Sequence, residues 1–126
     1  RLQSALSYPD ESVGALMDFD IITIREDVTL EVALRYLRRL GSLPNHTDKL
    51  FVVDRHDILR GVLPLKRMVV SDLDALVSDV MAVDAVMFNP EDIADEAAKA
   101  FERYDLVTAP VVDQNNKLVG RITVDA

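Results

Sequence analysis

The amino-acid sequence predicts an α+β fold built from two copies of one unit, packed on each other about a pseudo-twofold axis. The first observation is a repeated motif. LFVVDRHDILRGVLPLKR, from Leu50, is echoed by PVVDQNNKLVGRITVDA, from Pro110, with Val-Val-Asp and a later glycine in both. The second is that residues 16–40 match residues 80–104 in order. The third is that strand-like and helix-like periods alternate within each copy, which is typical of α+β modules.

Each copy opens with a short apolar run that is typical of a strand, at residues 21–24 and 85–88. Apolar residues at helical spacing come next and predict helices over 28–40 and 92–104. Acidic residues stand at both expected helix starts, where the helix dipole favours negative charge. Pro90 is a further sign that a helix begins there.

Two short strands joined by a polar turn complete each copy. The turns are DRHD and DQNN, whose residues favour hairpins. The expected strands are 50–53 with 58–63, and 109–112 with 118–124. The offset between the copies falls from 64 residues at the helices to 59 at the hairpins, so the first copy has five extra residues, placed in the loop 41–49. A short helix is expected at 65–70, and short helical or linking pieces at 1–7 and 72–80.

The expected domains are a lead segment at 1–15, a first copy at 16–79 and a second, C-terminally shortened copy at 80–126. One copy of about 60 residues buries too little surface to be comfortably stable alone. The chain has no cysteine, which excludes disulfides and Cys-bound zinc. It has neither a signal peptide nor an apolar run of the roughly 20 residues that a membrane helix needs. We therefore expect a soluble, cytosolic piece of something longer.

The acidic charge lies entirely in the second half of the sequence. Residues 1–71 hold ten acidic and ten basic side chains, whereas residues 72–126 hold twelve and four, which accounts for the net charge of −8. Such a surface repels nucleic-acid phosphates and attracts cations. The alternative is that the acidity only keeps the chain in solution.

The doubled pattern resembles the tandem CBS domain, a paired module named after cystathionine-β-synthase. LSYPDESVGALM (6–17), FERYDLVTAPVVD (101–113) and LVGRITVD (118–125) are also similar to the CBS pair of MgtE-family magnesium transporters. This resemblance implies a cytosolic regulatory domain that senses intracellular Mg²⁺ and gates a pore. It further implies a homodimer at the cytoplasmic face of the plasma membrane. Its partners in the same transporter would be an acidic N-terminal domain, a connecting helix and a membrane domain.

The resemblance also implies that carboxylates of the pair share Mg²⁺ ions with those other domains. Mg²⁺ prefers oxygen ligands and keeps part of its water, so one or two carboxylates per surface suffice. Asp105 aligns with a family aspartate at such a site and Asp95 with a family glutamate, while Ile93 and Ala126 stand where carboxylates often occur. The candidate metal ligands are Asp105, Asp95, Glu96, Glu91 and Asp92. The alternative is that Asp95 and Glu96 merely form a solvated helix face.

CBS pairs also bind adenine nucleotides, through a Ser or Thr and an Asp three residues later that holds the ribose. The first copy has Pro64 and Arg67 at these positions, and the second has Thr123 and Ala126. These departures predict weak nucleotide binding or none. The candidate nucleotide contacts are Thr123, Asp125, Lys66 and Arg67. The alternative function is an adenine-nucleotide sensor that regulates an enzyme or another transporter.

The sequence predicts no enzyme. Asp54, His56 and Asp57 occupy an expected hairpin tip without a supporting framework, so a plain turn is favoured over a metal or acid–base site. The chain has no phosphate-cradling glycine pattern and no nucleophile with an evident base.

Overall fold

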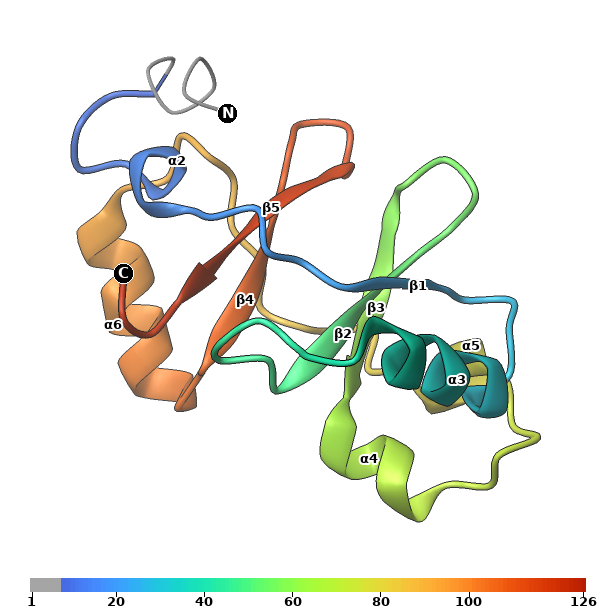
Figure 1. The fold of residues 1–126 in the computed structure, drawn as a ribbon. Coiled ribbons are helices and arrows are strands. Elements are labelled where there is room, and N and C mark those ends of the chain that lie inside the picture. The colour runs from blue at the N-terminus through green and yellow to red at the C-terminus, as the bar shows by residue number, and fades with distance from the viewer. Residues whose placement is uncertain (1–7) are drawn as a thin grey trace. The chain divides into compact units, whose positions relative to one another are not determined.

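The computed structural model describes residues 8–126, which form two compact units (Figure 1). The continuous unit is Ile21–Ala85. The split unit combines the described residues up to Asp20 with Val86–Ala126. None of the helices in residues 8–126 has the length and apolar composition that crossing a bilayer requires. The expected helical piece at 1–7 lies outside the described residues.

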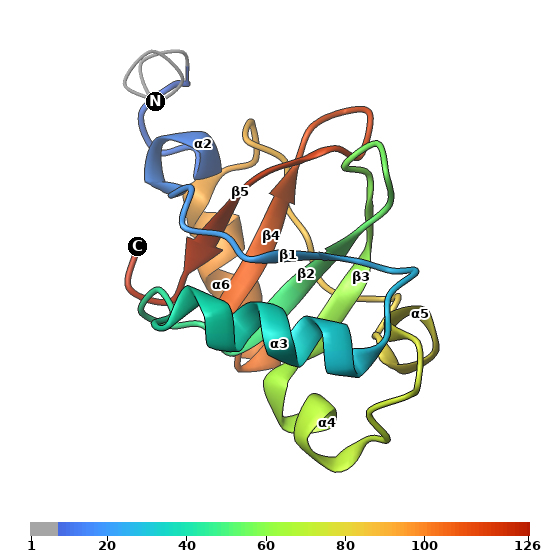
Figure 2. The ribbon, with the colours of Figure 1, turned by 45° about the vertical axis from the view of Figure 1, so that its right-hand side comes forward.

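The continuous unit contains a three-stranded sheet in the order β1-β2-β3. β1 runs parallel to β2, and β2 and β3 form an antiparallel hairpin. In Figure 2 the helix α3 lies across the strands. The elements are β1 (Thr23–Arg25), α3 (Leu30–Leu40), β2 (Lys49–Val53), β3 (Leu59–Pro64), α4 (Leu65–Val70) and α5 (Val77–Val80).

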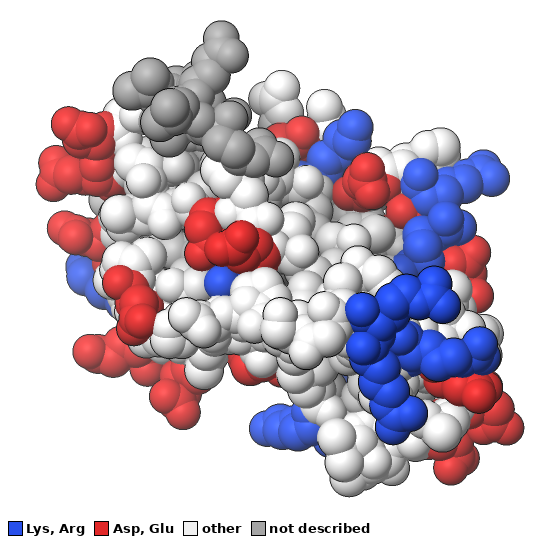
Figure 3. All heavy atoms as spheres, in the orientation of Figure 1, with Lys and Arg blue, Asp and Glu red and all other residues white. Residues whose placement is uncertain are grey.

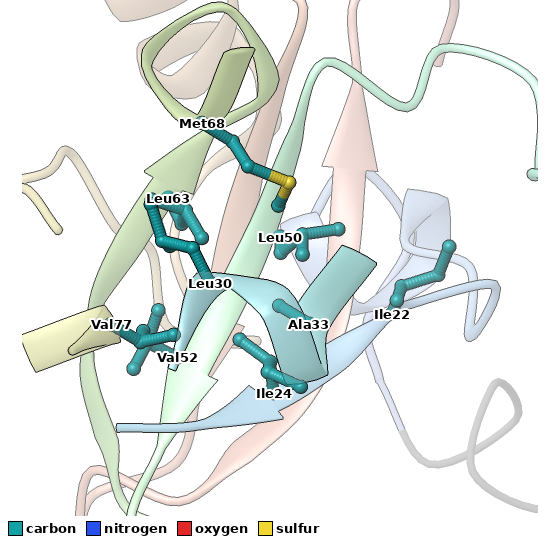
Figure 4. Packing of buried hydrophobic residues seen from close by; sticks show 9 residues of the cluster. All are labelled: Ile22, Ile24, Leu30, Ala33, Leu50, Val52, Leu63, Met68 and Val77. Atoms are coloured by element: carbon teal, nitrogen blue, oxygen red, sulfur yellow. The ribbon is translucent and has the colours of Figure 1, made fainter. Parts of the chain in front are cut away.

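The core of the continuous unit forms where its helices meet one face of this sheet (Figure 4). Leu30 and Ala33 come from α3, Met68 from α4 and Val77 from α5, and all four are buried. The strands and the segment before β1 supply Ile22, Ile24, Leu50, Val52 and Leu63. This apolar burial is the main favourable contribution to the stability of the unit.

The split unit has counterparts of α5, α3, β2 and β3, and its sheet has two strands. These counterparts are α2 (Val13–Leu16), α6 (Ala94–Tyr104), β4 (Thr108–Val112) and β5 (Leu118–Thr123). β4 and β5 pair antiparallel. Its core centres on Phe88 and Phe101, whose rings stack with centroids 6.0 Å apart, and on Val13 at 0% exposure. The expected offsets are confirmed, since α6 follows α3 by 64 residues and β4 follows β2 by 59.

The two units exchange their lead-in segments. Residues 9–18, which we call the strap, precede β1 in sequence but pack on the second copy. The Val13 N–H donates to the Asp92 carbonyl at 2.8 Å, and the Ala94 N–H to the Glu11 carbonyl at 2.8 Å. In the continuous unit, the Val77 N–H donates to Val28 and the Leu30 N–H to Ala75, which are the repeat equivalents. The expected boundaries at 16–79 and 80–126 follow the sequence copies, whereas the compact units divide the chain after Asp20 and after Ala85.

The repeated methionine and glycine meet at this exchanged contact. A Cβ at Gly61 would lie 2.5 Å from the Ala82 carbonyl oxygen and 3.0 Å from the Met81 sulfur. A Cβ at Gly120 would lie 2.9 Å from the Asp18 carbonyl oxygen. Glycine therefore recurs because the lead-in backbone crosses the strand at a distance that leaves no space for a side chain.

The strand expected at 85–88 is wrong, because only Phe88 makes a bridge there, to Val111. At the equivalent place in the continuous unit, the Glu26 N–H donates to the Val53 carbonyl at 3.0 Å. Pro90 stands at that position here and has no N–H to donate. The side-chain amide of Asn89 instead donates to the Val112 carbonyl at 2.8 Å. The helices also begin two residues later than expected, at Leu30 and Ala94.

Candidate functional site

The acidic charge of the chain gathers on the split unit. Counted over the full sequence, this unit has twelve acidic and five basic side chains, while the continuous unit has ten and nine. The resulting net charges are −7 and −1. Figure 3 shows acidic side chains along α6 and basic ones over α3. The difference in charge between the two halves of the sequence is therefore also a difference between the two structural units, because the strap adds its carboxylates to the split unit.

Four of the five candidate metal ligands lie together where the strap meets the start of α6. Two hollows share Glu91 and Ile93 in their walls. One also contacts Asp92 and Glu96 together with Met87, and the other contacts Asp95 and the strap residues Asp10 and Glu11. Ile93 is 60% exposed between them. The result is an acidic surface with an apolar centre, which we call the α6 entrance.

The carboxylates of the α6 entrance differ in how much the fold itself engages them. The Asp92 carboxylate accepts a hydrogen bond from the Asn89 N–H at 2.8 Å, which closes the turn before the helix. Glu96 lies 3.8 Å from the Lys99 ammonium, an exposed pair of little energetic weight. Glu91 and Asp95 are exposed. Asp92 therefore has a structural role, and the exposed carboxylates are better placed to meet a cation.

Asp105 lies at the opposite end of α6, where it terminates the helix. Its backbone is left-handed, with φ 53° and ψ 48°, and its N–H donates to the carbonyls of Phe101 and Glu102. A short polar side chain tolerates this conformation better than a branched apolar one. Asp95 and Asp105 are ten positions apart along α6, a rise of about 15 Å, so the structure does not bring Asp105 into the α6 entrance.

The arrangement limits how this chain could hold a metal ion. Across residues 8–126, no group of three or more His, Cys, Asp or Glu side chains converges closely enough for one. Carboxylate oxygens are nevertheless the ligands that Mg²⁺ prefers, and this ion often keeps several waters. These residues therefore fit a hydrated Mg²⁺ held by one or two carboxylates, with further ligands from another surface.

The candidate nucleotide contacts divide between the two units. Arg67 and Lys66 are exposed on α4, and the Arg67 guanidinium donates to the Val80 carbonyl at 2.8 Å, which ties α4 to α5. Thr123 is half-buried at the end of β5, opposite Thr108, and Asp125 is exposed just beyond it. Arg67 thus already has a structural contact within its own unit.

The residues that sequence reasoning left out are Asp10 and Glu11. They fall in the segment treated as a lead, and only the packing of the strap brings them beside α6. The motif PDES at 9–12 was a usable signal, since Ser12 caps α2 and accepts from the Ala15 N–H at 3.3 Å. A cap at Ser12 indicates that the preceding acidic residues belong to an ordered turn.

The polar cluster at the first hairpin tip forms a turn, in line with the sequence interpretation. The Asp54 carboxylate accepts from the His56 N–H at 2.8 Å and from the Ile58 N–H at 3.1 Å. Partial burial raises the pKa of Asp54, but these two hydrogen bonds, with nearby His56 and Arg60, hold it below its ordinary value overall. The second tip repeats the design, with Asp113 accepting from Asn115 and Lys117.

Comparison with known proteins identifies the family. The family model described as CBS domain matches residues 13–72 and again residues 77–126. The chain belongs to the CBS-domain family. Its two matches correspond to the two copies read from the sequence, so a tandem CBS pair is confirmed.

The chain is similar to one stretch of the magnesium transporter MgtE from several bacteria. The match to MgtE of Thermus thermophilus is 32% identical over 99% of this chain, and that to MgtE of Bacillus subtilis is 29% identical over 98%. The chain spans 28% of the length of each of these two relatives. The predicted resemblance of this CBS pair to the MgtE family is confirmed.

Solved structures of such proteins have the same fold. The soluble part of a magnesium transporter superposes with a TM-score of 0.92 and 28% identity, covering 98% of this chain and 48% of that one. The cytosolic domain of the Mg²⁺ channel MgtE in complex with ATP also gives 0.92, with 32% identity, covering 98% and 50%. The expected α+β fold of two CBS repeats is confirmed.

Proposed function

We propose that this CBS pair is the cytosolic regulatory domain of an MgtE-like transporter of Mg²⁺ or a related divalent cation, and that it senses intracellular Mg²⁺. The transporter would place the pair at the cytoplasmic face of the plasma membrane, next to a pore that the pair gates. No reaction is proposed, because the role rests on ion binding and domain separation. The similarity to MgtE over nearly the whole chain supports the assignment to a transporter.

The α6 entrance is the observation that carries the sensing role. Carboxylates of the strap and of α6 face the same hollow, so they repel one another when no cation is present. A hydrated Mg²⁺ between this surface and an acidic neighbouring domain of the transporter would replace that repulsion by attraction. Loss of the ion would then separate the domains and release the pore, which is a ligand-driven shift in population.

The test is thermal unfolding of the chain in millimolar MgCl₂, compared with NaCl at equal ionic strength. An ion that binds the folded form raises stability by mass action, so we expect a larger increase of Tm in MgCl₂. Glu91→Gln with Asp95→Asn should reduce that difference. The control is Asp72→Asn with Asp74→Asn, which removes equal charge from the continuous unit. Equal Tm in the two salts would exclude Mg²⁺ sensing by this surface alone.

A second candidate function is adenine-nucleotide binding, which the ATP complex of the MgtE cytosolic domain favours. Thr123 retains the hydroxyl of the family's ribose motif, whereas Arg67 and Ala126 replace its aspartates. Calorimetric titration with ATP, ADP and AMP distinguishes the possibilities. Micromolar binding that Thr123→Val weakens would support this function. Heats equal to those of dilution at millimolar nucleotide would leave Mg²⁺ as the regulatory ligand.

We also propose that the pair forms a homodimer, as the resemblance implies. The exposed apolar side chains near α4, which include Val69 and Val70 at 82% each, support an assembly surface. Sedimentation equilibrium over a wide concentration range tests it. A monomeric mass at the highest concentration would contradict the proposal.

A further inference from the structure

The outward face of α3 combines three arginines with exposed apolar side chains. Arg35, Arg38 and Arg39 are exposed within five residues of sequence. Val32, Tyr36 and Leu40 follow one another at i, i+4 spacing on the same helix and are each 40–42% exposed. In Figure 3 the basic side chains over α3 form the densest blue area of that view. We call this surface the α3 face.

A shallow hollow lies in the middle of the α3 face. Val32, Arg35, Tyr36 and Arg39 line it, and its volume is about 210 Å³. Residues four apart on a helix are neighbours, about 6 Å apart, so the two guanidinium groups flank the hollow on successive turns. Guanidinium forks match the oxygens of a phosphodiester, and an aromatic ring with an aliphatic neighbour suits the apolar part of an amphipathic ligand.

We propose that the α3 face docks on an anionic phospholipid bilayer. A basic helix face that also exposes Tyr and aliphatic side chains fits the boundary between headgroups and acyl chains. Leu40 extends the apolar stripe beyond the hollow, and Leu43 in the loop that follows the helix is also 40% exposed, so the surface suits an extended bilayer better than a free phosphate. The proposal uses the proposed function only for the nearness of a membrane.

The ion pairs within the continuous unit do not block this role. Glu31 is 3.8 Å from Arg35, and both side chains are well exposed. Such a pair contributes little, so Arg35 can turn to a lipid phosphate at small cost. The continuous unit has a net charge of only −1, whereas the split unit carries −7. Anionic lipid therefore repels the split unit and attracts the α3 face, which makes docking directional.

Docking of this kind is expected to be weak for the isolated chain. Each Arg near an anionic surface adds a modest attraction that salt screens. Attachment to a membrane domain would raise the effective concentration of the bilayer, so weak contacts would suffice to hold the pair in one orientation. The α3 face would then set how closely the regulatory pair approaches the membrane.

The experiment is co-sedimentation of the 126-residue chain with sucrose-loaded vesicles. One set is phosphatidylcholine alone, and the other contains one third phosphatidylglycerol. At low salt we expect about tenfold stronger partitioning to the anionic vesicles, lost at high salt. Arg35→Gln, Arg38→Gln and Arg39→Gln together should abolish the preference. Tyr36→Ser with Leu40→Ser should weaken binding while leaving the salt dependence intact.

The matched control replaces three exposed basic residues elsewhere, Arg55, Lys66 and Lys117, with Gln. It has the same net charge as the triple arginine variant and should keep the preference. Equal partitioning of the parent to both vesicle types would overturn the proposal, as would an equal loss in the control. If the arginine variant instead converts a dimer to a monomer without changing vesicle binding, a second copy covers this face and the lipid proposal is wrong. Mg²⁺ sensing by the α6 entrance is measured without vesicles, so the two proposals can fail separately.

Discussion

Arg121 on β5 and Asp18 on the strap form an ion pair 103 residues apart in sequence, with Nε donating to Oδ1 at 2.8 Å. Their backbones also bond in both directions, each N–H donating to the other's carbonyl at 2.9 Å. The Arg121 side chain is 6% exposed and that of Asp18 is 41% exposed. The strap is thus held to β5 by an ion pair whose guanidinium is buried and whose carboxylate is partly open to solvent.

The repeat places an apolar pair at the equivalent position of the continuous unit. Val62 corresponds to Arg121 and Ala82 to Asp18, and these two also form an antiparallel bridge. The geometry of the crossing therefore does not require charge. Val62 and Ala82 show which side chains the fold accepts there when the pair is removed.

Asp18→Ala is expected to destabilise the chain by about 1–2 kcal/mol, since Arg121 loses a carboxylate partner while water partly replaces it at the open side. Asp18→Ala with Arg121→Val, which copies the other unit, should cost less than the sum of the single changes. Replacing a buried ion pair by apolar residues is often close to neutral. Urea unfolding of the four proteins gives the coupling energy. Strict additivity would show that the pair does not act as a unit.

Gly14 packs beneath the ring of Tyr8, and a Cβ at this position would overlap that ring. Gly14→Ala should therefore displace Tyr8 and loosen the start of the strap, although Ala favours the helical backbone of α2. We expect faster hydrogen exchange at the Ala94 amide, which the strap residue Glu11 caps. Adding Tyr8→Ala should restore global stability to near that of Tyr8→Ala alone. If Gly14→Ala leaves exchange at Ala94 unchanged, the strap start and the cap are independent.

The sequence predicted the elements well and the exchange of lead-ins not at all. Periodicity placed α4 at 65–70 and the hairpins within one residue, because strands and helices leave local patterns. The contact between Asp18 and Arg121 leaves no local pattern, since its partners lie near opposite ends of the chain. The same holds for Asp10 and Glu11, which belong to the α6 entrance only because the strap crosses to the other copy. The resemblance was enough to name the candidate residues around α6. Only the structure shows that they lie at two opposite ends of this helix.

Asp54 should make the free energy of unfolding of the chain decrease at low pH. Two backbone N–H groups hold the pKa of its carboxyl below its ordinary value, despite the opposing effect of burial. A lowered folded-state pKa gives stability that is fully present above the ordinary value, near 3.8, and is lost as pH falls through the folded value. Asp54→Asn keeps an oxygen acceptor but cannot titrate, so its stability should fall less between pH 5 and pH 3.

The control for this prediction is Asp57→Asn in the same turn. Asp57 has a left-handed backbone, φ 64°, that Asn adopts easily, so the change removes equal charge without strain. Urea midpoints measured across the pH range compare the three proteins. Parallel curves for the parent and Asp54→Asn would mean that other carboxyls account for the acid sensitivity.

The two ends of α6 should respond to Mg²⁺ independently. Glu91 and Asp95 lie at the α6 entrance, and Asp105 terminates the helix about 15 Å away. Asparagine adopts the left-handed backbone as readily as aspartate, so Asp105→Asn removes only the charge. Its effect therefore reports on ion binding rather than on the fold. If each end holds its own hydrated ion, the loss of Mg²⁺-dependent Tm increase in Asp105→Asn should add to the loss in Glu91→Gln with Asp95→Asn. The increase is taken relative to NaCl at equal ionic strength, because screening alone relieves repulsion between carboxylates. If either variant alone removes the whole effect, the ends are coupled through one binding event. If Asp105→Asn leaves the Mg²⁺-dependent increase of Tm unchanged, only the α6 entrance binds the ion in this chain.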